Sequence, residues 1–125
     1  MSVLQIYLSP TGRISRRTYW LRFILPVFLL PVLLIVLLPP TFLADLDSAV
    51  VWSPATLVVF VAIGLIANWL IILGGIKRIH DRNRPGAFLL FYLVPLIGPL
   101  WLMIELGFLR GSIGANRFGP DPLRS

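Results

Sequence analysis

The side chains best suited to chemistry are concentrated in one short stretch, GGIKRIHDRNRPG, at residues 74–86. His80 beside Asp81 has the residue types of a general acid–base pair or of part of a metal site. Adjacent residues on a helix point about 100° apart, however, and the chain contains no second histidine. We therefore expect neither a catalytic pair nor a metal or cofactor site in this stretch.

The arginines of the same stretch, Arg78, Arg82 and Arg84, suit a different chemistry. Guanidinium groups beside a membrane bind lipid phosphates and hold the adjoining segment on one side of the bilayer. Asp81 would then pair with one of them. We predict that Arg78 forms this ion pair, because it shares a helical face with Asn68, and that Arg82 contacts lipid head groups.

Two polar side chains lie inside apolar runs. Asn68 falls on the same helical face as Gly64 and Gly75, which predicts a hydrogen bond to a neighbouring helix rather than a transport path. An acid within a membrane is a functional candidate, which would give Glu105 a role in proton coupling. Glu105 is also close to the end of its run, so its carboxylate could instead extend to the interface toward Arg110.

The tail, GSIGANRFGPDP at residues 111–122, is rich in glycine and proline and predicts turns or extended chain rather than helix. Asn116, Arg117 and Asp121 could reach the basic stretch only if both lie on the same side of the membrane. The sequence has no Ser/His/Asp arrangement, no glycine-rich phosphate loop and no paired carboxylates within one segment. We therefore do not expect an enzyme.

The composition indicates lipid as the solvent of the elements that carry these residues. Of the 125 residues, 58% are hydrophobic and 13% are charged, which differs strongly from soluble globular proteins. The net charge of +6 comes from basic residues placed beside apolar segments rather than on one soluble face, so nucleic acid is not an expected partner. Cysteine is absent, which excludes disulfides and thiolate metal sites.

Three apolar segments predict an all-α integral membrane protein. Residues 23–43 would form a helix about 31 Å long, enough to cross the hydrocarbon core, and residues 55–76 are apolar and uncharged. The third segment, residues 87–109, has prolines in its middle. We expect a single kinked transmembrane helix there, with a re-entrant hairpin turning between Pro95 and Pro99 as the alternative.

The distribution of charge predicts the orientation. Eight basic residues lie within residues 1–22 and 77–86, and none lies within the acidic stretch 44–54. By the positive-inside rule, the amino terminus and the second stretch are cytoplasmic and the acidic stretch is external. The tail, residues 110–125, carries three more arginines, which three complete spans would place outside. Either this tail is translocated despite its charge or the third segment turns back.

Three patches in fixed order carry a resemblance over nearly the whole chain. They are GRISRRTYW at residues 12–20, KRIHDRNRPGAF at residues 77–88 and GANRFGPDP at residues 114–122. Together they resemble a bacterial membrane family known as domain of unknown function 805. The resemblance implies an integral inner-membrane protein of about this size and brings no established activity with it.

Two functions are compatible with these residues. The first is a non-enzymatic scaffold or regulator whose basic cytoplasmic face binds anionic lipid head groups, a membrane-protein partner or a second copy of the chain. The second is an oligomeric small transporter or channel that uses Asn68 and Glu105. The first is favoured because few polar groups lie inside the apolar segments and the cations lie at their borders.

Overall fold

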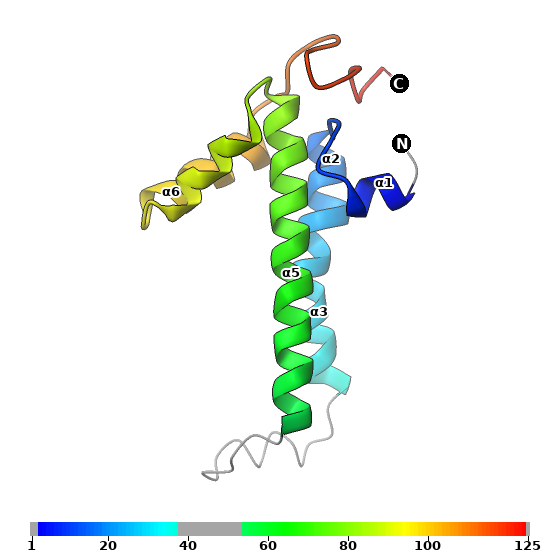
Figure 1. Cartoon of the computed structure of the whole chain (residues 1–125), viewed down its shortest axis with the longest axis vertical. Helices are drawn as coiled ribbons and strands as arrows, with labels where there is room; N and C mark the ends of the chain where they lie inside the picture. Colours follow the sequence, from blue (N-terminus) through cyan, green and yellow to red (C-terminus); the bar gives the residue numbers. More distant parts are fainter. Residues whose placement is uncertain (1–2, 38–53, 125) are drawn as a thin grey trace.

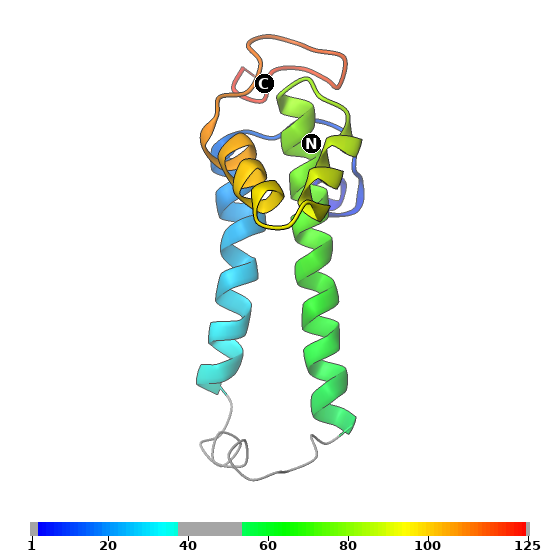
Figure 2. The ribbon, with the colours of Figure 1, turned by 90° about the vertical axis from the view of Figure 1, so that its left-hand side faces the viewer.

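The computed structural model describes residues 3–37 and 54–124, and this part of the chain is mostly helical. Two long helices run side by side, and the remaining elements gather at one end of them (Figures 1 and 2). The only β feature within the described ranges is an isolated bridge between Asn116 and Gly119. We call the gathered end, formed by residues 3–24 and 73–124, the head.

The first long helix is continuous but changes its winding. It consists of α2 (Arg16–Tyr19), a π-helical stretch η1 (Trp20–Ile24) and α3 (Leu25–Leu37). The hydroxyl oxygen of Ser15 accepts a hydrogen bond from the backbone N–H of Thr18 at 3.2 Å, which caps the start. The helix therefore begins seven residues before the predicted boundary at residue 23, and residues 38–43 of the predicted span lie outside the described residues.

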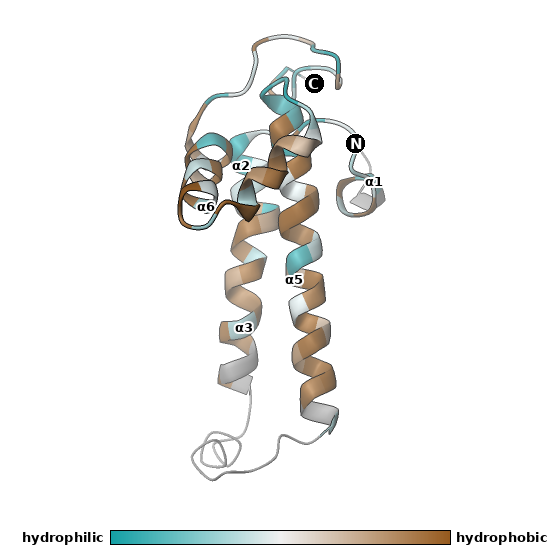
Figure 3. Cartoon of the chain, turned by 60° about the vertical axis from the view of Figure 1, so that its left-hand side comes forward, coloured by the Kyte–Doolittle hydropathy of each residue, from teal (hydrophilic) through white to brown (hydrophobic). Residues whose placement is uncertain are grey.

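The second long helix is α5 (Pro54–Asp81), which starts at a proline, a residue favoured in the first helical turn. Its stretch Leu57–Asp81 is the one described helix that is long and apolar enough to cross a membrane. Only 11% of its most apolar window is buried in the structure, whereas the core helix of a soluble protein would be mostly buried. Figure 3, which is coloured by residue hydropathy, shows that most residues along both long helices are apolar and that many polar residues lie in the head.

The third apolar segment does not form the single kinked helix that we expected. It forms two short helices, η2 (Gly86–Leu93) and the continuous run of α6 (Ile97–Leu102) and η3 (Met103–Phe108), and the chain folds back between them (Figure 2). The turn includes Leu96 in the left-handed region, with a φ of 64°. A Cβ atom on Gly98 would lie 1.7 Å from the carbonyl oxygen of Phe91, so only glycine permits this approach. The hairpin that we held as the alternative is the observed arrangement.

The small core lies in the head rather than between the long helices. The short N-terminal helix α1 (Val3–Leu8) packs beside α5, where the indole N–H of Trp69 donates to the carbonyl oxygen of Tyr7 at 3.0 Å. The buried hydrophobic side chains come from the N-terminal segment, the first long helix, α5 and the second arm of the hairpin; they are Ile6, Ile14, Tyr19, Phe23, Leu73, Ile79, Leu102 and Leu106. The fold thus concentrates its packing around the end of α5 that carries the charged residues.

Candidate functional site

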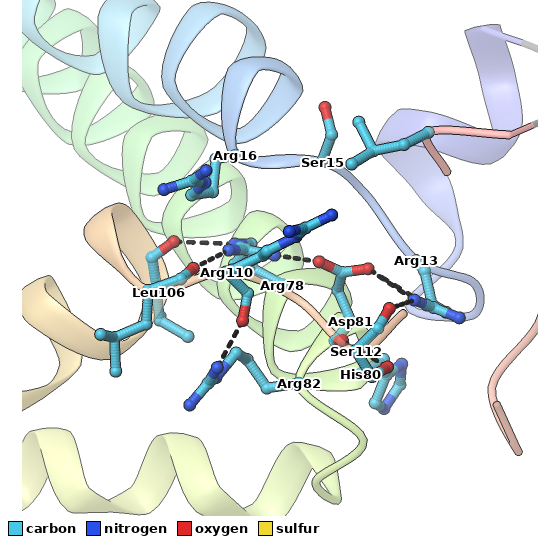
Figure 4. Close-up of polar contacts among 12 residues, drawn as sticks. Arg13, Ser15, Arg16, Arg78, His80, Asp81, Arg82, Leu106, Arg110 and Ser112 are labelled. Atoms are coloured by element: carbon cyan, nitrogen blue, oxygen red, sulfur yellow. Dashed lines mark hydrogen bonds and ion pairs between the residues drawn. The ribbon is translucent and has the colours of Figure 1, made fainter. Parts of the chain in front are cut away.

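A buried ion-pair triad lies at the centre of the head (Figure 4). The carboxylate of Asp81 lies between two guanidinium groups, with Arg13 at 3.0 Å on one oxygen and Arg78 on the other. All three side chains are at most 5% exposed. Arg78 and Asp81 lie one turn apart on α5, which explains why the helix continues past the end we predicted at residue 76.

Arg13 connects this triad to the tail. Its guanidinium donates to the carbonyl oxygens of Ser112 at 2.7 Å, Gly114 at 2.7 Å and Gly119 at 3.1 Å. Arg78 likewise donates to the carbonyl oxygen of Leu106 at 2.8 Å. The two arginines therefore bind segments that are distant in sequence, and one carboxylate supplies the counter-charge for both.

The tail comes close to Asp81 where the chain leaves the hairpin. A Cβ atom on Gly111 would lie 1.8 Å from a carboxylate oxygen of Asp81, so a side chain there would displace the ion pair. The backbone N–H and the hydroxyl of Ser112 donate to the carbonyl oxygen of Asp81 at 2.7 and 2.9 Å. These contacts satisfy a carbonyl oxygen at the C-terminal end of α5.

Lys77 is a second fully buried cation. Its ammonium group donates to the carbonyl oxygens of Gln5 at 2.6 Å and Ile6 at 2.7 Å. These are carbonyl oxygens at the end of α1, where the helix dipole favours a positive charge. Lys77 thus fixes α1 against α5.

Glu105 pairs with different partners from the one we predicted. Its carboxylate lies 3.0 Å from Arg82 and 3.5 Å from Arg84, and it is 3% exposed. The prediction that Glu105 extends toward Arg110 is wrong, because the hairpin brings η3 back beside the end of α5. Arg84 also lies over the ring of Phe88 at 4.6 Å, so neither Arg82 nor Arg84 is simply a solvated cation.

His80 and Asp81 do not face each other. The His80 ring stacks on Phe118 with centroids 4.0 Å apart, and its Nδ1 lies 3.3 Å from the carbonyl oxygen of Gly12. The carboxylate of Asp81 is occupied by the two arginines. This geometry does not form an acid–base pair.

The polar residues of the tail do reach the stretch 74–86. The side-chain amide of Asn116 donates to the carbonyl oxygen of His80 at 2.9 Å, and Arg117 donates to that of Asn83 at 3.3 Å. Asp121 instead closes a turn within the tail. The backbone N–H groups of Leu123 and Gly114 donate to its two oxygens at 3.0 Å and hold its pKa below the ordinary value of 3.8.

Asn68 does not bond to a neighbouring helix as we predicted. Its side-chain amide donates to the carbonyl oxygen of Gly64 at 2.9 Å, one turn back on the same helix, and the residue is exposed. It lies about 20 Å along the axis of α5 from Arg82, the ion-pair partner of Glu105. The structure therefore does not bring the two intramembrane candidates together.

Sequence reasoning missed two residues of the site, Arg13 and Lys77, which it treated only as topology-setting charges. A signal for Arg13 was present, because Arg13 lies in GRISRRTYW, one of the three patches that carry the family resemblance. Its partner Asp81 lies 68 residues away, a distance over which spacing predicts no contact. For Lys77, the partners are backbone carbonyls, and a sequence pattern carries no signal for those.

The remaining cations form an exposed group. The side chains of four arginines are exposed and make no hydrogen bond or ion pair within residues 3–37 and 54–124; they are Arg17, Arg22, Arg110 and Arg124. All 11 basic residues of the chain lie in the head, together with three of its five acidic residues, which gives the head a net charge of +8. The head is therefore strongly basic and borders directly on the apolar surface of the long helices.

Comparison with known proteins identifies a family and relatives in the inner membrane. The family model described as "Protein of unknown function (DUF805)" matches residues 7–120. The chain is 31% identical to the inner membrane protein YhaI of Escherichia coli, over 98% of this chain and 92% of that protein. It is 30% identical to the inner membrane protein YhaH of the same organism, over 98% of this chain and 93% of that protein. No solved structure matches it. The sequence, the apolar helix and these relatives together show that the chain is a small membrane protein of the DUF805 family.

Proposed function

We propose that the protein is a non-enzymatic scaffold of the inner membrane whose basic head binds anionic phospholipids on the cytoplasmic side. The observation that carries the proposal is the placement of all 11 basic residues in the head, next to exposed apolar surface. Each Lys or Arg near an anionic leaflet contributes about 1 kcal/mol of attraction. A head with a net charge of +8 would therefore concentrate anionic lipids around it.

The proposed topology has two spans and one re-entrant hairpin. The parts of α5 and α3 that lie outside the head would cross the membrane, and the charged residues of the head would remain at the cytoplasmic face by the positive-inside rule. The hairpin would enter the same leaflet without crossing it. Its large exposed apolar side chains support this placement; they include Leu90, Phe91, Leu93, Leu96, Ile97, Leu100 and Trp101.

The transporter alternative has less support. Its two proposed residues are engaged elsewhere, Asn68 with the carbonyl oxygen of Gly64 and Glu105 with Arg82 and Arg84. A proton path needs polar groups that follow one another through the apolar region. Nothing in the described residues links these two.

Lipid preference can be measured with tryptophan fluorescence in reconstituted vesicles. Brominated phosphatidylglycerol or brominated phosphatidylcholine is mixed with unlabelled lipid, and the quenching gives the relative affinity of the protein for each lipid. We expect phosphatidylglycerol to be preferred, and salt to weaken the preference because exposed charges are screened.

The test variant replaces Arg17, Arg22, Arg110 and Arg124 with glutamine. These side chains form no hydrogen bond or ion pair within the described residues, so the change removes four charges without breaking such a contact. We expect it to lose up to about 4 kcal/mol of this preference. The corresponding lysine variant should retain most of it, because attraction to a charged surface depends on charge rather than on guanidinium geometry. Equal quenching of the parent protein by the two lipids would contradict the proposal.

A further inference from the structure

We infer that the head contains a defined binding site for one anionic phospholipid, with the phosphate in an arginine-lined cavity and an acyl chain in an adjoining apolar hollow. This inference rests on the proposed function. Whereas the proposed function needs only an electrostatic attraction between the basic head and anionic lipids, the inference places one lipid at a defined position. Two neighbouring cavities and the helix face that joins them carry the inference.

The first cavity has a volume of about 280 Å³ and lies between the start of α2, the end of α5 and the tail. Its charged lining consists of four arginines and two aspartates, a net charge of +2; they are Arg16, Arg17, Arg78, Arg110, Asp81 and Asp121. Figure 4 shows Arg16, Arg110 and Arg78 gathered on one side of Asp81, with Arg13 on its other side.

The aspartates of this cavity are already occupied. The carboxylate of Asp81 binds Arg13 and Arg78, and that of Asp121 accepts two backbone N–H groups. Neither forms an ion pair with Arg17 or Arg110, whose guanidinium groups have no hydrogen-bond or ion-pair partner among the described residues. An anion is the ligand that would compensate this charge, and arginine binds phosphate oxygens through paired N–H donors.

The second cavity has a volume of about 260 Å³ and lies between the first long helix, α5 and the hairpin. Its lining is apolar and aromatic and includes Trp20, Ile24, Phe28, Tyr92 and Met103. It adjoins the exposed apolar surface of α3, which we place in the membrane. A hydrocarbon chain is the occupant that matches both this lining and its surroundings.

One face of the first helix connects the two cavities. Arg16 lines the first cavity, while Trp20, Ile24 and Phe28 line the second and follow it at intervals of four residues. Arg16 donates to the carbonyl oxygen of Phe108 at 2.7 Å, and the indole of Trp20 donates to that of Gly107 at 3.0 Å. The basic and apolar cavities are thus about one turn apart, or about 6 Å of helical rise, which a glycerol backbone can bridge.

Native mass spectrometry of the full chain in detergent, titrated with a short-chain phosphatidylglycerol, tests this site. We expect one retained lipid per chain and weaker retention of phosphatidylcholine. Arg17→Gln with Arg110→Gln should lower the affinity for phosphatidylglycerol about 30-fold, from about 1 kcal/mol for each arginine. The control pair, Arg22→Gln with Arg124→Gln, removes the same charge outside both cavities and should leave the affinity nearly unchanged.

A second pair of variants tests the apolar hollow without changing charge. Met103→Trp would fill the hollow and should lower the affinity for phosphatidylglycerol, whereas Ile104→Trp, at an equally exposed position outside it, should not. Because none of these six side chains makes a described hydrogen bond, we expect the variants to fold, and thermal unfolding checks this.

The outcomes separate the site from the general proposal. Equal losses from the two arginine pairs would overturn the site and leave surface attraction as the explanation. Full displacement of the lipid by inorganic phosphate at the same concentration, or no effect of Met103→Trp, would overturn the acyl-chain part. If neither arginine pair changes lipid retention and the parent also shows no preference for anionic lipid in vesicles, the proposed function fails as well.

Discussion

Asp81 is central to the head, because it is the only residue that forms an ion pair with Arg13 or Arg78 within the described residues. Burying two guanidinium groups with one carboxylate is favourable only while every donor has a partner. The carbonyl oxygens of the hairpin end and the tail provide the other partners. The triad therefore joins four separate segments of the chain.

Asp81→Asn should destabilise the protein by about 3 to 5 kcal/mol, because it leaves two buried arginines without their counter-charge. The measurement is the free energy of unfolding by denaturant in detergent micelles. Asp121→Asn is the control, since that carboxylate is half-buried and forms no ion pair among the described residues, and the amide oxygen can still accept one of the two backbone N–H groups. Equal stability of the Asp81→Asn protein and its parent would show that the triad is not structural.

The turn of the tail should respond to acid through Asp121. Because the folded state holds the pKa of this carboxyl below 3.8, the turn is fully stabilised above that ordinary value and is lost as the pH falls through the lowered one. Amide resonances of Gly114 and Leu123 should report this titration in nitrogen-15 labelled protein. In Asp121→Asn the same resonances should not titrate, and an unchanged titration in that variant would assign the effect to another group.

Part of this site could be predicted from the sequence. The ion pair of Arg78 with Asp81 was predicted from the helical face that Arg78 shares with Asn68, and the structure contains this pair between residues one turn apart on α5. No partner was suggested for Arg13, and the one suggested for Glu105, Arg110, differs from those observed, because these contacts depend on where the N-terminal segment and the hairpin return to α5. Arg82, which we expected at lipid head groups, binds Glu105 for the same reason.

At the scale of elements, the hairpin is the feature that decides the architecture. The apolar run of residues 87–109 has the composition of a span, and its prolines are compatible with either a kinked helix or a turn. The close approach of Gly98 to Phe91 favours the turn, a contact that sequence periodicity does not reveal. In contrast, the apolar runs predicted the two long helices well, apart from their ends, which charged and capping residues set.

Gly98→Ala should therefore open or distort the hairpin. The added Cβ would lie 1.7 Å from a backbone oxygen, and overpacking of this kind costs about 1 to 3 kcal/mol. The free energy of unfolding in micelles measures the loss. Gly64→Ala is the matched control, because a Cβ there meets nothing within 4 Å and alanine favours a helix by about 1 kcal/mol over glycine. A Gly98→Ala protein at least as stable as Gly64→Ala would contradict this packing.

At the scale of the whole molecule, the fold gathers every basic residue of the chain at one end. The sequence alone left the side of the tail open, because three complete spans would have placed Arg110, Arg117 and Arg124 outside. The contacts of Arg13 with Ser112, Gly114 and Gly119 now join the tail to the N-terminal segment. These contacts support the proposed topology, in which the N-terminal segment and the tail lie on the same side of the membrane.

The central claim, that the N-terminal segment, the charged end of α5 and the tail lie together on the cytoplasmic side, is tested most directly by cysteine labelling in intact cells. The chain has no cysteine, so Ser48→Cys and Ala115→Cys each introduce a single thiol. Ser48 lies in the acidic stretch, outside the described residues, and Ala115 is an exposed residue of the tail. With a membrane-impermeant thiol reagent, we predict that Ser48→Cys reacts in intact cells and that Ala115→Cys reacts only after the cells are permeabilised. Reaction of Ala115→Cys in intact cells to the same extent as Ser48→Cys would contradict the claim.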